Sequence, residues 1–253
     1  MDLRLDIAYD GEPFRGFARQ PRVRTVQGDL EEALGRVLGG EPRLDVAGRT
    51  DAGVHALGQV CGLSAAPEIE DTARLQGALN GMCGPSISIH GLTIAPGDWH
   101  ARFSARSRTY VYALLESEVP DPFLARTSWM QPRPLDVEAM NEAAGHLLGE
   151  RDFSSFGRLP DDEASAIRNL YELRCIRRHR IVRIRARANA FIHQMVRSLV
   201  GTLVQVGEGR RSPDELPQIL DARDRAAAGP VAPPHGLCLV AVEYDDGWSG
   251  GVV

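Results

Sequence analysis

The sequence predicts an α+β protein with two units, each of which combines strands and helices. Residues 3–7 and several later segments alternate apolar and polar side chains with the period of a strand. Other segments, beginning with 26–38, repeat apolar residues every three or four positions, as an amphipathic helix does. Because both patterns occur in each half of the chain, we expect two α+β domains, residues 1–105 and 106–253.

The first half is expected to hold four strands and two helices. Alternation or short apolar runs predict strands at 3–7, 44–46, 54–64 and 87–94. Helical periodicity predicts helices at 26–38 and 72–80. The loop that follows the strand at 44–46 is bounded by glycines, so it joins two strands through a sharp turn.

The second half repeats this theme with a longer hairpin and more helices. Strands are predicted at 106–115 and 237–244, with a hairpin between 167 and 190. Helices are predicted at 136–148, from 191 to 204, and at 213–222. The Ala-, Gly- and Pro-rich segment 226–235 predicts a loop.

The basic side chains other than histidine are all arginine, because the 253 residues include no lysine. A Schiff-base lysine and a P-loop lysine are therefore excluded. No Gly-x-Gly-x-x-Gly motif follows a predicted strand, so the sequence lacks the usual indication of a site for a dinucleotide cofactor. We expect the chemistry to be carried by side chains, without a small-molecule cofactor.

Four cysteines are scattered singly through the chain, with no Cys-x-x-Cys pair and no histidine at metal-ligand spacing. They are expected to be reduced and mostly buried, and we expect no bound metal. No apolar run approaches the roughly 20 residues of a membrane-spanning helix, and the N-terminus has no secretory pattern. These features predict a soluble cytoplasmic protein.

The loop from Gly48 to Gly53 sets one carboxylate, Asp51, two positions after Arg49. Glycines allow a sharp turn and the close approach of a large ligand, and the guanidinium favours an ionised carboxylate. An ionised, accessible carboxylate can act as a nucleophile or a base. The alternative is an Asx turn in which Asp51 caps its own loop and Arg49 is a surface partner.

Apolar residues from Phe191 to Val204 form one stripe of a predicted helix, with Arg197 at its border. A border arginine can reach a partly buried anion while the helix stays packed. The commoner alternative is a guanidinium that extends from a core helix to water.

A period of two places Arg106, Arg108, Tyr110 and Tyr112 on one face of the strand at 106–115. On an exposed face, rings beside guanidinium groups offer base stacking and phosphate contact, which single-stranded RNA recognition requires. The alternative is an ordinary half-buried strand.

A formal net charge of −5 argues against a nucleic-acid partner, because phosphate neutralisation supplies much of the affinity. The arginines are nevertheless concentrated at 102–108 and 174–187, where they interleave with Ile and Val in the second cluster. Two basic clusters near the candidate motifs predict an RNA-binding track. The alternative for either cluster is a solvated strand face.

Several motifs occur together and in order along the chain. They are Tyr9-Asp10-Gly11, Thr25-Val26-Gln27, Gly48 to His55, His100 to Ala105, Tyr110-Val111-Tyr112, Asp152 to Phe156, Arg168-Asn169, Phe191 to Arg197 and Gly236-Leu237. With these motifs the sequence resembles the tRNA pseudouridine synthase A family over nearly its whole length. The glycine-bounded Arg-Thr-Asp loop is the most specific of them.

The resemblance implies two similar α/β units, RRM- or ferredoxin-like, around a central mixed, mostly antiparallel sheet. Helices would flank this sheet, with the active-site cleft between the units. It also implies an isomerase that converts uridine to pseudouridine at positions 38, 39 and 40 in the anticodon stem-loop of tRNA. The enzyme would need no cofactor and would act as a homodimer.

The resemblance assigns the catalytic carboxylate to Asp51, with support from Arg49, Tyr110 and Arg197. Tyr110, rather than Tyr112, would pack on the flipped uracil, and Arg197 would pair with Asp51. Arg49 would fill the space left by the flipped base or hold the RNA backbone. Substrate binding is further expected at His55, Arg102, Arg106, Arg108 and Leu237.

Asp51 has three open catalytic routes: it bonds to the base, bonds to the sugar, or removes a sugar proton. Two stretches depart from the family pattern, where Phe17-Ala18 replaces a Trp-Gln pair after Gly16 and Pro85-Ser86-Ile87-Ser88 replaces a Pro-x-Asp-Ile stretch. Two other functions are weighed. One is a non-catalytic RNA-binding module of the same fold. The other is a glycosidase or nucleosidase, which usually needs a second positioned acid, and no second acid lies in 48–55, 106–115 or 191–197.

Overall fold

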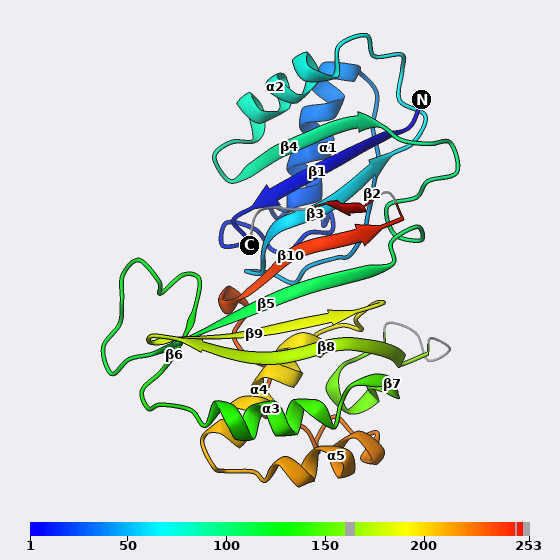
Figure 1. Ribbon diagram of the computed structural model, residues 1–253. Coiled ribbons are helices and arrows are strands. Elements are labelled where there is room, and N and C mark those ends of the chain that lie inside the picture. Colours follow the sequence, from blue (N-terminus) through cyan, green and yellow to red (C-terminus); the bar gives the residue numbers. More distant parts are fainter. Residues whose placement is uncertain (160–164, 246, 250–253) are drawn as a thin grey trace. The chain divides into compact units, whose positions relative to one another are not determined.

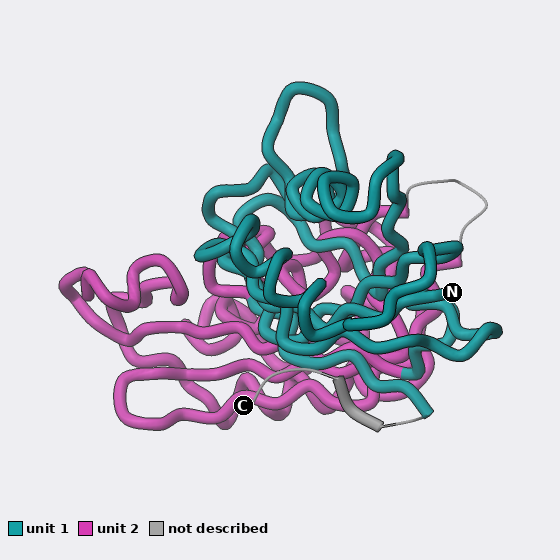
Figure 2. Tube along the Cα trace, turned by 90° about the horizontal axis from the view of Figure 1, so that it is seen from above, with its two compact units in different colours: residues 1–106, 238–253 teal, residues 107–237 magenta. Residues whose placement is uncertain are grey.

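The computed structural model describes residues 1–159, 165–245 and 247–249 (Figure 1). The chain forms two compact units, shown in different colours in Figure 2. Unit 1 comprises residues 1–106 and 238–253, and unit 2 comprises 107–237. This partition places the strand predicted at 237–244 with unit 1, whereas the domains expected from the sequence are two continuous segments.

Unit 1 contains a mainly antiparallel sheet in the order β4-β1-β3-β10. Its strands are β1 (Leu3–Tyr9), β2 (Leu44–Val46), β3 (His55–Leu63), β4 (Ile87–Ile94), β10 (Leu237–Tyr244) and β11 (Gly247–Ser249). β1 is antiparallel to both of its neighbours, β10 runs parallel to β3, and the short β2 and β11 pair with β3 and β10. The alternating burial of β1 confirms the period-two prediction for this strand.

Two capped helices belong to unit 1, α1 (Val26–Leu38) and α2 (Thr72–Cys83). Thr25 accepts from the Gly28 N–H over 3.2 Å, and Asp71 accepts from the Arg74 N–H over 2.9 Å. Such caps satisfy amides that would otherwise lack a partner in the first turn. The buried leucines of both helices lie in the core of this unit, so both helix predictions are confirmed.

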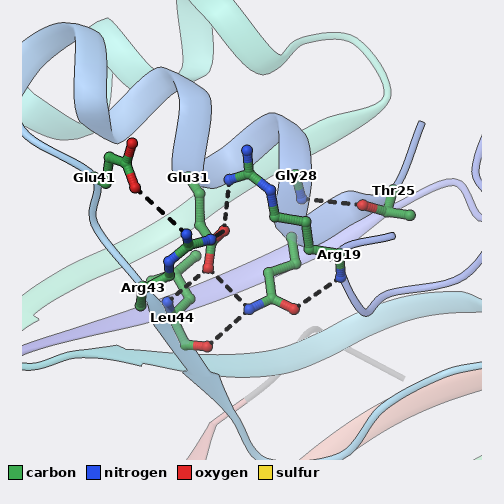
Figure 3. A network of polar contacts seen from close by, with 8 residues as sticks. Arg19, Thr25, Gly28, Glu31, Glu41, Arg43 and Leu44 are labelled. Atoms are coloured by element: carbon green, nitrogen blue, oxygen red, sulfur yellow. Dashed lines mark hydrogen bonds and ion pairs between the residues drawn. The ribbon is translucent and has the colours of Figure 1, made fainter. Parts of the chain in front are cut away.

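Glu31 of α1 is 2% exposed, although its side chain is a carboxylate. Figure 3 shows its carboxylate among donors from three segments, the loop before α1, α1 itself and the start of β2. Arg19 Nη1 and Gln27 Nε2 each donate to it over 2.9 Å, and the Leu44 N–H donates over 3.0 Å. Buried charges in proteins are normally paired in this way.

Unit 2 contains an antiparallel sheet in the order β5-β9-β8-β7, and the short β6 runs parallel to β5. Its strands are β5 (Ser107–Glu116), β6 (Trp129–Gln131), β7 (Gly149–Asp152), β8 (Ile167–Arg178) and β9 (Ile181–Ala188). Its helices are α3 (Val137–Gly145), α4 (Met195–Gly207) and α5 (Leu216–Ala222), with short 3₁₀ turns η1 (Ser154–Phe156), η2 (Pro213–Glu215) and η3 (Pro234–Gly236). Mainly antiparallel strands flanked by helices confirm the predicted α+β class.

The helix predicted from Phe191 begins four residues later, at Met195. Gln194 has a φ of 63°, in the left-handed region, and the Arg158 N–H donates to His193 O over 3.1 Å. A residue in the left-handed region cannot continue a right-handed helix, and the His193 carbonyl is already paired. The start of the predicted helix is therefore wrong, while its apolar stripe beyond Met195 is confirmed.

Candidate active site

Asp51 lies in unit 1, in the turn that joins β2 to β3. The Val54 N–H donates to Asp51 O over 3.1 Å and closes the turn. Gly53 has a φ of 79°, a conformation that favours glycine. Asp51 has intermediate exposure. The turn therefore holds a carboxylate where a ligand can reach it; we refer to residues 48–54 as the Asp51 turn.

A buried polar network lies on the N-terminal side of Asp51. The hydroxyl groups of Tyr9 and Thr50 are 2.7 Å apart, and Gln59 Nε2 donates to Gly48 O over 2.7 Å. Tyr9, Thr50 and Gln59 are each at most 8% exposed. Because unpaired buried polar groups are costly, this network fixes the backbone that precedes Asp51. Sequence reasoning gave these three residues no role; the available indication was a lone glutamine in an apolar strand.

A second loop, residues 10–17, packs closely against the Asp51 turn. A Cβ atom at Gly11 would lie 2.1 Å from Val54 O, so only glycine fits at this position. The Phe17 N–H donates to Thr50 O over 3.0 Å. The Asp51 turn is thus held from two sides, by β3 and by this loop.

His55 connects the same loop to the start of β3. The Gly11 N–H donates to His55 Nδ1 over 3.1 Å, and Asp10 Oδ1 lies 3.1 Å from the same nitrogen. The same ring nitrogen thus lies within 3.1 Å of both a backbone amide and a carboxylate oxygen of the loop. The structure gives His55 a local contact, and its role in substrate binding stays a prediction.

Three candidate arginines also lie in unit 1, and all three are exposed. Within the described residues Arg49 forms no ion pair. The Arg102 guanidinium lies 5.6 Å from the ring centroid of Phe103. Arg106 donates two hydrogen bonds of 2.8 Å to Asp245, and these bonds lower the pKa of that carboxylate. Arg106 precedes β5, so it does not belong to the strand that was predicted to carry it.

Arg108, Tyr110 and Arg197 lie in unit 2. Tyr110 meets Phe191 edge to face, with ring centroids 5.3 Å apart. Arg108 Nη1 donates to Asn189 O over 2.8 Å, and Arg197 Nε donates to Ala232 O over 2.7 Å. Each guanidinium is thereby anchored to a backbone carbonyl. Leu237, 5% exposed, follows η3 directly.

The exposed aromatic and basic face predicted for β5 is wrong. Tyr112 is fully buried, and its hydroxyl donates to Pro233 O over 2.8 Å. Burial raises the pKa of Tyr112, against the opposing effect of the Arg197 charge. Arg108 and Tyr110 are each only 8% exposed. Both faces of this strand are largely buried, so it belongs to the core more fully than the half-buried strand considered as the alternative.

The basic cluster at 174–187 divides into a strand face and two ion pairs. Arg174 lies opposite Arg185, and their neighbours on the same face include further arginines; we define the hairpin face as Arg174, Arg178, Arg183, Arg185 and Arg187. Arg177 pairs instead with Glu116, and Arg180 pairs with Asp121. On the hairpin face itself, Arg185 contacts Glu172 over 3.1 Å, and Arg187 lies 5.2 Å from the Tyr171 ring centroid.

The predicted site residues therefore fall into two groups. Arg49, Asp51 and His55 share the segment from the Asp51 turn to β3, and Tyr110 lies with Phe191 in unit 2. The predicted pairing of Asp51 with Arg197 joins residues of different units and stays a prediction.

The four cysteines are free, and three of them are buried, as expected. In the part of the chain that the structure describes, no cluster of three or more His, Cys, Asp or Glu side chains could hold a metal ion. The described helices are also too short or too polar to cross a membrane.

Comparison with known proteins gives consistent similarities. A family model described as tRNA pseudouridine synthase matches residues 143–245. Proteins named tRNA pseudouridine synthase A are 44% identical over 245 residues in Cereibacter sphaeroides (95% of each chain) and 42% identical over 244 residues in Rhizobium meliloti (95% of this chain, 98% of the relative). The Frankia casuarinae protein of the same name is 47% identical over 245 residues, which covers 96% of this chain and 89% of the relative. The chain belongs to the tRNA pseudouridine synthase A family.

Proposed function

We propose that the protein is an isomerase that converts uridine to pseudouridine in tRNA, with Asp51 as its catalytic carboxylate. Family membership supports the reaction and the kind of RNA. The proposed sites of modification are positions 38, 39 and 40 of the anticodon stem-loop. The observation that carries the proposal is a partly exposed carboxylate on a turn held by a buried polar network.

The reaction suits a site that works with side chains alone. Isomerisation breaks the bond between C1′ and N1 of uridine and forms a bond between C1′ and C5. A proton leaves C5 and N1 gains one, so the reaction balances without a co-reactant. The target base must first leave its stack to reach a carboxylate. Bonding to the base, bonding to the sugar and removal of a sugar proton all start from the ionised form of Asp51.

The supporting roles link the two groups of predicted residues. Arg197 would pair with Asp51, which would favour the ionised carboxylate and fix its orientation. Tyr110 would pack on the flipped uracil, and Leu237 would line the pocket. Arg49 is exposed beside Asp51, which suits a side chain that fills the space of the flipped base or holds the RNA backbone.

RNA binding is proposed for the hairpin face, together with His55, Arg102, Arg106 and Arg108. Like charges on neighbouring strands disfavour one another, and an RNA backbone would neutralise them. Charge reversal at Arg183, an exposed member of the hairpin face, should weaken tRNA binding more than it slows the chemical step. Filter binding over a salt series tests this, and an unchanged affinity would contradict it.

We further propose that the protein acts in the cytoplasm as a homodimer, in which one tRNA contacts both subunits. The resemblance to the tRNA pseudouridine synthase A family carries this part of the proposal. Light scattering should give the mass of two chains, and the mass of one chain would contradict the homodimer.

Asp51→Asn tests the catalytic role most directly. Wild-type protein and the variant are incubated with an unmodified tRNA that carries uridines at 38–40, and pseudouridine is mapped by carbodiimide labelling and reverse transcription. The same change at the exposed Asp98 is the matched control. We expect conversion by the wild type and by Asp98→Asn, and binding without conversion by Asp51→Asn.

Three results would contradict this proposal. Conversion by Asp51→Asn at the wild-type rate would remove Asp51 from the chemistry. Binding without conversion by the wild type, across several tRNAs, would favour the RNA-binding module. Release of free uracil would favour a nucleosidase, because isomerisation releases nothing.

A further inference from the structure

A tightly held loop in unit 1, residues 99–104, presents a phenylalanine ring to solvent. Phe103 is 77% exposed. The His100 N–H donates to Ser104 Oγ over 3.0 Å, and the Ser104 N–H donates to His100 O over 3.0 Å. The Arg102 N–H donates to His100 Nδ1 over 3.1 Å. These hydrogen bonds fix the loop, so the ring is displayed by a folded backbone.

Two side chains of the loop lie against this ring. The ring centroids of His100 and Phe103 are 4.5 Å apart, and the Arg102 guanidinium lies 5.6 Å from the Phe103 centroid. His100 is itself held at 3.4 Å from a carboxylate oxygen of Asp45. An exposed ring with a guanidinium beside it can stack an unpaired base and contact its phosphate.

Within the same unit, the loop packs near the end of β3, whereas Asp51 precedes the start of that strand. Trp99 and Ala101 pack against Gly62 near the end of β3, whereas Ala56, near its start, pairs with Tyr9 of the polar network. These two positions on β3 are six residues apart, which corresponds to about 20 Å at about 3.3 Å per residue. A base on Phe103 is therefore a different nucleotide from the one at Asp51.

We propose that Phe103 is a stacking platform for an unpaired base of the tRNA, with Arg102 contacting an adjoining phosphate. This inference rests on the proposed function, because it takes tRNA as the ligand. It adds a second point of contact outside the reacting nucleotide. Because the platform is remote from the chemistry, its loss weakens binding and leaves the rate of isomerisation in the bound complex unchanged.

Phe103→Ala should weaken tRNA binding about 10-fold, the order expected when one stacked base is lost. Its single-turnover rate at saturating enzyme should equal that of the wild type. Phe103→Trp should restore the affinity, and its added fluorescence should fall when tRNA binds. Phe123→Ala is the matched control, since Phe123 is 91% exposed in the loop between β5 and β6. Melting temperatures of all variants should match, because the replaced rings are exposed.

Unchanged affinity of Phe103→Ala would overturn the inference, as would an equal loss in Phe123→Ala. A fall in mass of Phe103→Ala by light scattering would show that the ring contacts a second copy of the chain instead. The two proposals fail separately. If the wild type forms no pseudouridine but Phe103→Ala still binds tRNA more weakly, the proposed reaction fails and the platform stands. If the wild type is active and Phe103→Ala binds equally well, only the platform fails.

Discussion

Glu31→Ala should destabilise the protein far more than the same change at its neighbour Glu32. Glu31 is 2% exposed and accepts hydrogen bonds from two side chains and one backbone amide, as Figure 3 shows. Arg43 Nη1 is a fourth donor, at 3.4 Å. Glu32 is exposed, and among the residues that the structure describes it pairs with Arg36, one turn along the same helix. The two residues thus offer a matched comparison on one helix.

The magnitude follows from which donors lose their partner. Leu44 is buried, and its N–H would lose its acceptor at a cost of about 1–3 kcal/mol. The amide of Gln27 keeps one partner, Leu44 O at 3.1 Å. The side chains of Arg19 and Arg43 are 52% and 64% exposed, so they turn to water and each contributes about 0–1 kcal/mol. The sum is about 1–5 kcal/mol, with a midpoint of about 3 kcal/mol.

For a chain of this size, the midpoint of about 3 kcal/mol lowers the melting temperature by roughly 6–12 °C. Glu32→Ala should cost no more than about 0.5 kcal/mol, the value of an exposed pair one helical turn apart. Thermal and urea unfolding of both variants measure the difference. Equal melting temperatures for Glu31→Ala and Glu32→Ala would refute the reasoning, because they would show that the buried carboxylate contributes no more than an exposed one.

The remaining predictions concern a glycine, a carboxylate and the thiols. Gly11→Ala should slow pseudouridine formation about 100-fold, because the new Cβ would lie 2.1 Å from Val54 O and displace the Asp51 turn. Gly77→Ala should retain activity in the same assay, because a Cβ at this position of α2 has no atom within 4 Å. Burial alone would raise the pKa of Glu116, but hydrogen bonds from Arg177 and the Leu135 amide hold it below the ordinary 4.5. The stabilisation by Glu116 is therefore complete above pH 4.5 and is lost as the pH falls through the lowered pKa. The free energy of unfolding that Glu116→Gln costs, measured in urea, should shrink in acid. A cost that grows in acid would contradict this. Burial also raises the pKa of every thiol, to about 11 for Cys83 and about 12 for Cys175 and Cys238. Ellman's reagent should therefore react slowly with the native protein and with all four thiols after unfolding. Rapid reaction of the native protein would contradict this.

Local patterns predicted most of the elements. The helix expected at 26–38 has the bounds of α1, because its apolar spacing and its Thr25 cap both depend on residues close together in the sequence. The strand at 87–94 matches β4 for the same reason. Alternation also identified the 167–190 hairpin, whose two strands pair in the expected antiparallel sense.

Features that depend on distant segments were missed or misread. The period-two pattern predicts an exposed face for Tyr112, because nothing near it in the sequence shows that Gly236 packs on its ring. The start of α4 was misplaced because the bridge between Arg158 and His193 joins segments far apart in the chain. The polar network beside Asp51 unites Tyr9 and Gln59 from different strands, so periodicity could mark each strand but not their contact.

Unit 1 is built from two segments separated by unit 2, so its sheet cannot be completed until the second segment has been synthesised. Residues 1–106 emerge first, but β10, which pairs with His55 and Ala56 of β3, emerges only after all of unit 2. Until then, the N-terminal half of β3, next to the Asp51 turn, lacks a hydrogen-bonding partner that it has in the finished protein. Unpaired strand edges invite pairing with other chains. A nascent chain stalled before residue 237 should therefore depend on chaperones, because unit 1 completes its sheet only after unit 2 has been synthesised.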